Sequence, residues 1–274
     1  LSGGKLVPLD YRSVQGAAQG CWEAGAGFDC ATLSYFQRAD QRLAENGGCA
    51  RATADDLTLC GDPEAVWATF ADLKADMARD LLLELQNTKS EAFSPTGEFG
   101  NMPEGVVVGE NAGTGDRAGV VGRGVVVAGT PIGDDAFKAN IAGSEVDRVC
   151  SIIEPVHSKL NSIDARDAAF QVHRLSLCHR LDYLAQVVSP FTPGVLPAFE
   201  RVDEVLSRAV TDTMGSNPYA PDPEASDPGL VRARAHLPVR LQGLGLPRVA
   251  DIAFAAVVGG MELTLPRFGD QEQE

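Results

Sequence analysis

Two short apolar runs flank a pair of adjacent acids in the stretch Cys49-Ala50-Arg51-Ala52-Thr53-Ala54-Asp55-Asp56-Leu57-Thr58-Leu59-Cys60-Gly61. Because aspartate is depleted in β-strands and favoured in turns, this pattern predicts two strands joined by a tight turn. Successive residues of a strand face opposite sides of the sheet. The turn would therefore hold the carboxylates of Asp55 and Asp56 side by side at the tip of a hairpin.

Adjacent carboxylates are a candidate site for a divalent metal ion. Like charges repel, so the arrangement is unfavourable unless a cation lies close to both. Mg²⁺ prefers a few carboxylates together with phosphate oxygens and water. Two such ions clamp the attacking and leaving oxygens in nucleotidyl transfer, which makes Asp55 and Asp56 candidate catalytic residues and metal ligands. An ordinary Asp-Asp turn on the surface is the alternative that these residues leave open.

The composition is that of a globular protein, with 44% hydrophobic and 22% charged residues in a chain of 274. That length holds one large or two smaller domains and buries a sizeable core. There is no apolar run long enough for a membrane span and no signal-peptide core, so we expect an intracellular protein, nuclear or cytoplasmic. The first residue is Leu1, and we expect the chain to be a piece of a longer protein.

The net charge of −15 argues against a surface coated with lysines that bind phosphate. Local clusters of arginine between residues 131 and 250 leave nucleic-acid binding possible there. The cysteines form no C-x-x-C pair, and we expect reduced, mostly buried thiols. The histidines lack the spacing of a zinc site and are interpreted as structural. These residues are Cys21, Cys30, Cys49, Cys60, Cys150 and Cys178, and His157, His173, His179 and His236.

Around the acidic hairpin the pattern predicts an α+β layer, with helices on one face of an antiparallel sheet. A helix from about Phe28 to Asn46 would end at Gly47-Gly48, and a second would run from the N-cap Asp62 to about Leu85. A strand is expected near residues 91–93. Residues 124–129 read as a buried strand, followed by a turn at 130–133.

The rest of the chain reads as helical, with apolar stripes at residues 146–160, 170–184 and 199–210. Asp134 is predicted to cap the first of these helices. Four prolines mark residues 216–228 as a linker, and a final helical part ends in an acidic tail. The predicted domains are 1–133 as the α+β part, 134–215 as a helical part, 216–228 as linker and 229–274 as C-terminal extension.

One further segment invites a nucleotide-loop interpretation, namely Gly113-Thr114-Gly115-Asp116-Arg117-Ala118-Gly119. It lacks the Gly-Lys-Ser/Thr ending of a P-loop, and a strand-like run follows where a helix would begin. A flexible hairpin loop fits better. A small-molecule enzyme of the Rossmann type, built on this loop, is a minor alternative.

In this order, the motifs resemble the C-terminal half of a reverse transcriptase of the non-LTR retrotransposon type. The resemblance spans roughly residues 10–260. Five segments carry it: Ser13-x-x-Gly16-x-x-Gln19-Gly20, Ala54-Asp55-Asp56, Leu85 to Ser90, Val127-Ala128-Gly129-Thr130-Pro131-Ile132-Gly133, and Leu237-Pro238 through Gly243-Leu244-Gly245-Leu246. It implies a partial polymerase palm in residues 1–133, followed by a helical thumb and a C-terminal extension.

The resemblance also implies an activity, RNA-directed DNA polymerisation with Mg²⁺ or Mn²⁺. Asp55 and Asp56 would hold metal, and Lys89 would protonate the leaving pyrophosphate. RNA template, DNA primer and dNTP would be the partners in the full-length parent, with no membrane. The nucleotide and template contacts would come from Ser13, Gly16, Gln19 and Gly20, and the primer grip from Val127, Ala128 and Gly129.

Several residues depart from the family's pattern. Cys21-Trp22 follows Gly20 where Asp-Pro is usual, Thr53 replaces a tyrosine, and Gln242 replaces a glycine. Asp10 lies too close to Ser13 to be the family's first catalytic aspartate. The chain is therefore expected to lack the fingers and one metal-binding carboxylate, and to be inactive alone. A catalytically dead remnant, serving at most as an interaction module, is the competing hypothesis.

Overall fold

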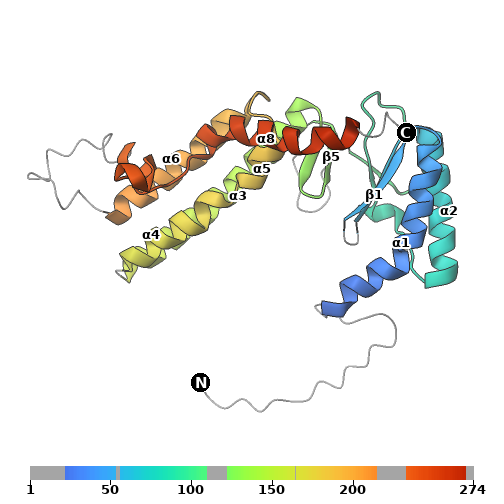
Figure 1. Cartoon of the computed structure of the whole chain (residues 1–274), viewed down its shortest axis with the longest axis horizontal. Coiled ribbons are helices and arrows are strands. Elements are labelled where there is room, and N and C mark those ends of the chain that lie inside the picture. The colour runs from blue at the N-terminus through green and yellow to red at the C-terminus, as the bar shows by residue number, and fades with distance from the viewer. Residues whose placement is uncertain (1–21, 54–55, 110–121, 164, 215–232, 270–274) are drawn as a thin grey trace, which may run out of the picture. The chain divides into compact units, whose positions relative to one another are not determined.

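The computed structural model describes residues 22–53, 56–109, 122–163, 165–214 and 233–269 (Figure 1). The described residues form two compact units, the first within the spans 1–90 and 98–107 and the second within the spans 91–97 and 108–274. Each contains helices and a small antiparallel sheet, so the α+β class is confirmed. No helix in the described ranges has the length and apolar character that crossing a bilayer requires.

The first unit is a β-hairpin that packs on two helices. Its elements follow the predicted order: α1 (Trp22–Ala44), β1 (Cys49–Thr53), β2 (Asp56–Cys60), α2 (Pro63–Leu81) and the 3₁₀ turn η1 (Asn87–Lys89). The expected glycine cap of α1 is confirmed, because Gly47 has a φ of 70° and the Gly48 amide donates to the carbonyl of Leu43. The expected cap of α2 is confirmed as well, since the Asp62 carboxylate accepts from two amides of the first turn.

One face of the hairpin supplies the apolar contacts of this unit. Ala50 lies opposite Leu59, and both pack with the buried Ala39 and Leu43 of α1. Strand residues alternate between faces, so Cys49, Thr53, Asp56 and Cys60 belong to the opposite face. The hairpin therefore has a face that rests on helices and a face that carries the acid.

The second unit is mainly helical, with a second hairpin at its start. The short strands β3 (Glu91–Ala92) and β4 (Val107–Val108) pair with each other. The remaining elements are β5 (Gly124–Val127), β6 (Thr130–Gly133), α3 (Asp135–Ser162), α4 (Arg166–Leu175), η3 (Leu177–His179), α5 (Asp182–Val187), α6 (Val195–Met214), η5 (Val239–Leu241) and α8 (Val249–Gly269).

Two expectations for this unit are wrong in detail. The predicted turn at 130–133 is strand β6, and the chain reverses earlier, at Ala128 and Gly129, whose φ angles are 48° and 80°. Two consecutive residues with positive φ make the tight hairpin turn that suits twisted strands. The single helix expected over residues 170–184 is interrupted between α4 and α5 by η3. As predicted, Asp134 caps α3 by accepting from the amide of Phe137.

A continuous apolar core holds the helical unit together. α3 packs along α6, and α5 packs along α8. The predicted stripe of α3 lies inside this core, where Val146, Val149 and Ile153 are fully buried against Phe199 of α6. The hairpin β5–β6 belongs to this unit, although residues 1–133 were predicted to form one domain. The linker predicted at 216–228 lies outside the described residues.

Candidate functional site

Asp56 is the described member of the acidic pair. It is the first residue of β2 and lies opposite Thr53, so two residues separate the strands. Its side chain is exposed, on the face turned away from the helices. Asp55 lies outside the described residues. A hairpin around the acidic pair is therefore confirmed, although Asp56 begins strand β2 and does not lie in the turn as predicted. Metal binding by the two acids stays a prediction.

Asp40 of α1 fixes the hairpin from its outer edge. One oxygen of its carboxylate accepts from the backbone amide of Ala50 at 2.8 Å and from the guanidinium of Arg51 at 2.8 Å. A carboxylate that takes an amide of an edge strand stops a further strand from pairing there. This contact was not predicted, because no local pattern links Asp40 to Ala50 and Arg51, which lie on the next element of the chain.

Lys89, the predicted general acid, ends the 3₁₀ turn η1 and is exposed. Its neighbour Asn87 holds the segment in place. The Asn87 side chain accepts from the ammonium of Lys74 at 2.8 Å and donates to the carbonyl of Glu104 at 2.8 Å. The segment that carries Lys89 is thus tied both to α2 and to the following loop, while the ammonium of Lys89 itself stays accessible to solvent.

The primer-grip residues form the tip of the second hairpin. Val127 is half-buried, whereas Ala128 and Gly129 are exposed. Tyr183 of α5 holds this tip: its hydroxyl donates to the carbonyl of Ala128 at 3.0 Å and lies 2.8 Å from the hydroxyl of Thr130. A Cβ on Gly129 would approach the Tyr183 ring to 3.3 Å. Tyr183 was not predicted, since nothing in its local sequence marks it.

The predicted residues are distributed over the two units. Asp56 and Lys89 belong to the first, and residues 127–129 belong to the second. The four predicted nucleotide and template contacts, Ser13, Gly16, Gln19 and Gly20, lie outside the described residues. Within the described ranges, no three side chains of the metal-binding types lie close enough to hold an ion.

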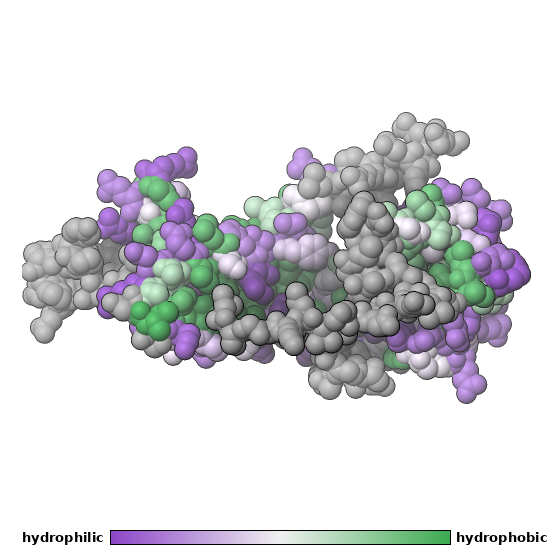
Figure 2. Space-filling model, turned by 90° about the horizontal axis from the view of Figure 1, so that it is seen from below, coloured by the Kyte–Doolittle hydropathy of each residue, from purple (hydrophilic) through white to green (hydrophobic). Residues whose placement is uncertain are grey.

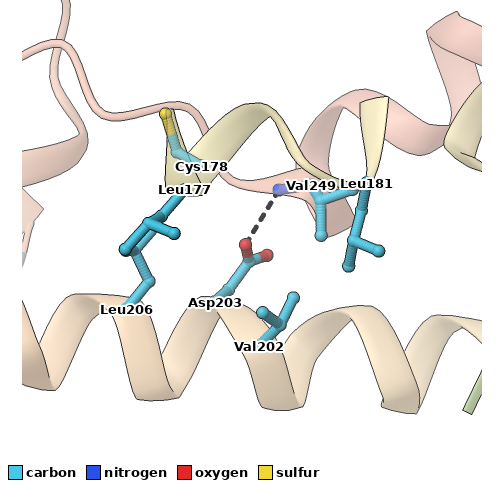
Figure 3. Close-up of a pocket in the computed structure, with 7 residues that line it drawn as sticks. All are labelled: Leu177, Cys178, Leu181, Val202, Asp203, Leu206 and Val249. Atoms are coloured by element: carbon cyan, nitrogen blue, oxygen red, sulfur yellow. Dashed lines mark hydrogen bonds between the residues drawn. The ribbon is translucent and has the colours of Figure 1, made fainter. Parts of the chain in front are cut away.

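A small cavity in the helical unit is structural in character. It measures about 10 Å³, room for a single water molecule, and Asp203 of α6 points into it beside Leu177, Cys178 and Leu206 (Figure 3). The Asp203 carboxylate accepts from the amides of Val249 and Ala250 at 2.9 Å each, and so caps α8. Burial raises the pKa of Asp203 against the opposing effect of these two amides. The cavity is too small for a substrate.

Hydrophobic side chains are also exposed among the hydrophilic ones on the surface (Figure 2). On the helical unit, Phe191 is 79% exposed and stacks edge-on against Phe254 of α8, with ring centroids 5.2 Å apart. Val258 and Met261 continue the exposed side of the helix at intervals of four and three residues. This face has the character of a contact surface without an identified partner.

Comparison of the chain with protein-family models, with curated proteins and with solved structures found no match. A functional assignment therefore depends on the motifs and on the geometry described above.

Proposed function

We propose that the chain is part of an RNA-directed DNA polymerase that transfers nucleotides with the help of two Mg²⁺ ions. The observation that carries the proposal is the position of Asp56, exposed at the tip of a tight hairpin and followed by a well-capped helix. The order of the five motifs along the chain supports the same conclusion. The carboxylates of Asp55 and Asp56 fit the oxygen ligands that Mg²⁺ or Mn²⁺ takes.

The other residues have separate roles in this proposal. When bound, the metal ions supply the positive charge that stabilises the transferring phosphoryl group. Lys89 provides a solvent-accessible ammonium that can protonate the departing pyrophosphate. The tip of the second hairpin, residues 127–129, supports the primer end and is itself held by Tyr183.

The geometry of the first hairpin also suggests where the missing catalytic aspartate belongs. The described residues give this sheet two strands, and Asp40 already occupies an amide on the outer edge of β1. A third strand, bearing the upstream aspartate, would therefore pair with β2, next to Asp56. Without this strand the site has too few carboxylates for two metal ions, and we expect the chain to be inactive alone.

Manganese titration tests the metal site on the chain as it exists. Mn²⁺ is paramagnetic and broadens the NMR signals of nearby amides. We expect broadening centred on residues 53–57, reduced strongly in Asp55→Asn and Asp56→Asn. Glu84→Gln is the matched control, because Glu84 is exposed and has no ion pair in the described part of the chain. Equal broadening in all variants, or broadening centred on α2, would contradict the proposal.

Under this proposal, polymerisation is tested on a longer chain that supplies the third strand and its aspartate. In primer extension on an RNA template, Asp55→Asn should abolish synthesis, and Lys89→Ala should slow it by about 10²–10⁴-fold. The Glu84→Gln variant should extend primers at the normal rate.

A catalytically dead remnant that acts as an interaction module is the second candidate. The exposed Phe191–Phe254 pair and the net charge of −15 favour it. Two results together would support this second candidate. A longer chain would fold but extend no primer, and the NMR signals of the first hairpin would not be broadened by Mn²⁺.

A further inference from the structure

Two thiols face each other at the open end of the first hairpin. Cys49, the first residue of β1, lies directly opposite Cys60, the last residue of β2. Both are free, and their side chains are within hydrogen-bonding contact. Directly opposed residues share a face of the sheet, so the two thiols lie on the face turned away from α1 and α2. Cys60 is exposed and can be reached by a reagent in solution.

The backbone spacing at this position already suits a covalent bond. Opposed residues in an antiparallel pair have Cα atoms about 4.5–5.5 Å apart, inside the range of about 4.4–6.8 Å found for disulfides. Gly48 and Gly61, which flank the two cysteines, also allow the two strands to approach closely. A Cβ on Gly48 would clash with the carbonyl oxygen of Cys60, and one on Gly61 would lie 3.1 Å from the Cα of Gly48. A bond between the two sulfurs therefore needs little movement of the backbone.

We propose that Cys49 and Cys60 are a modification site, which a small-molecule disulfide converts into a cross-strand disulfide. In the first step one protein thiolate attacks a sulfur of the reagent and releases one small thiol. In the second step the other protein thiolate attacks the mixed disulfide and releases the second small thiol. Two protein S–H groups are thereby oxidised to one S–S bond, the reagent is reduced to two thiols, and these carry away the two protons.

The local geometry favours this pairing over reaction at either cysteine alone. Burial, followed by the charge and the hydrogen bond of Cys49, raises the pKa of the Cys60 thiol. A raised pKa lowers the thiolate fraction and slows attack, so the link is favoured by the direct opposition of the two cysteines across the hairpin and not by the acidity of the Cys60 thiol. A mixed disulfide formed at one cysteine would be attacked by the thiolate of the other, so this intermediate should be short-lived.

The new bond would act on the strand that carries the acid. It would close a loop of twelve residues, Cys49 to Cys60, with Asp56 near the opposite end of the hairpin. A slip of one residue would turn Cys49 to the other face of the sheet, so the bond also locks the register. The inference stands on the two thiols and does not require the polymerase assignment.

Peptide mapping after oxidation tests the site on the whole chain. The protein is incubated with oxidised glutathione, its remaining thiols are blocked with iodoacetamide, and it is digested with trypsin without reduction. Cleavage after Arg51 separates the two cysteines into peptides 43–51 and 52–74. We expect these two peptides to appear linked, at the sum of their masses less two hydrogens, about tenfold faster than any other cysteine pair.

Variants make the result specific. Cys60→Ser should abolish the linked peptides, whereas Cys30→Ser, which alters another exposed cysteine, should leave them unchanged. The oxidised wild-type chain should melt about 5 °C higher than the reduced one, and this shift should be absent in Cys60→Ala. Stable glutathione adducts on both cysteines without a link, or links to Cys30 at a similar rate, would overturn the proposal.

Discussion

The two compact units of this chain are held together in different ways. The helical unit has a continuous core, in which α3, α5, α6 and α8 bury one set of apolar side chains. The hairpin unit has a thin apolar layer around Ala39, Leu43 and Ala50, and many of its contacts between α1 and α2 are ionic and exposed. The proposed catalytic acids thus belong to the unit with less buried apolar surface.

This difference has consequences for stability. Burial of a large apolar side chain contributes about 1.5–3 kcal/mol, whereas an exposed ion pair contributes about 0–1 kcal/mol. We therefore expect substitutions on the surface of the helical unit to have little effect on its stability, and substitutions of its buried residues to lower it. The hairpin unit should respond to changes at its surface charges. Both tryptophans, Trp22 and Trp67, lie in the hairpin unit, so their fluorescence follows that unit alone.

The largest effect is expected from Asp203→Ala in the helical unit. The substitution leaves the amides of Val249 and Ala250 buried without an acceptor. Each such group costs about 1–3 kcal/mol, so the free energy of unfolding should fall by about 4 kcal/mol in total. Urea unfolding followed by circular dichroism measures this loss.

The tryptophan signal provides the internal control for Asp203→Ala. If the units unfold independently, the fluorescence transition should stay where it is in the wild type. A matched shift of both signals would instead mean that the two units unfold as one, and the contrast between them would then have no thermodynamic meaning.

A smaller effect in the same unit concerns His173, which is fully buried on α4. Neither ring nitrogen has a hydrogen-bond partner among the described residues, and the His157 ring lies 5.8 Å away. Burial, and then the charge of His157, lowers the pKa of His173 to about 4. Between pH 6.5 and 4 the unfolded chain therefore binds a proton that the folded chain does not, and this unit loses stability as the pH falls.

The size of that loss follows from the same shift and should approach about 3 kcal/mol at pH 4. His173→Leu removes the titrating ring while filling a similar volume, and its stability should depend less on pH in this window. Chemical unfolding of both proteins at pH 7, 5.5 and 4 measures the difference. Parallel pH curves for the two proteins would show that His173 does not titrate as described.

The sequence predicted those features that depend on neighbouring residues, namely helix caps and the first hairpin. The caps at Gly47, Asp62 and Asp134 follow from residue types within one turn of the helix, and each is present. The tip of the first hairpin follows from the preference of aspartate for turns. The predicted turn of the second hairpin was misplaced because Ala128 has a positive φ. Alanine rarely adopts this conformation, so the residue type does not indicate a turn at this position.

The contacts that the sequence did not predict join residues far apart in the chain. Asp203 caps a helix that begins 46 residues later, and Tyr183 holds a turn 55 residues earlier. No periodicity or motif predicts such pairs, because any of several polar side chains could form a hydrogen bond with the same backbone group. For the candidate site, the motif order indicated the residue types, and the structure places Asp56 and Lys89 in one unit and residues 127–129 in the other.

The smallest effect is expected in the hairpin unit, where Asp76 of α2 accepts from Arg38 of α1 at 3.4 Å and from Arg79 at 2.8 Å. Asp76→Asn should lower stability by about 0.5–1 kcal/mol at low salt, seen as an earlier tryptophan transition. Glu84→Gln removes the same charge without an arginine partner in the described residues, and it should be neutral or slightly stabilising in a chain of net charge −15. In 1 M NaCl the two variants should converge, because the ions screen such exposed pairs. If Asp76→Asn and Glu84→Gln behave alike at low salt as well, the exposed ion pairs do not hold α1 to α2, and the thin apolar layer around Leu43 must suffice.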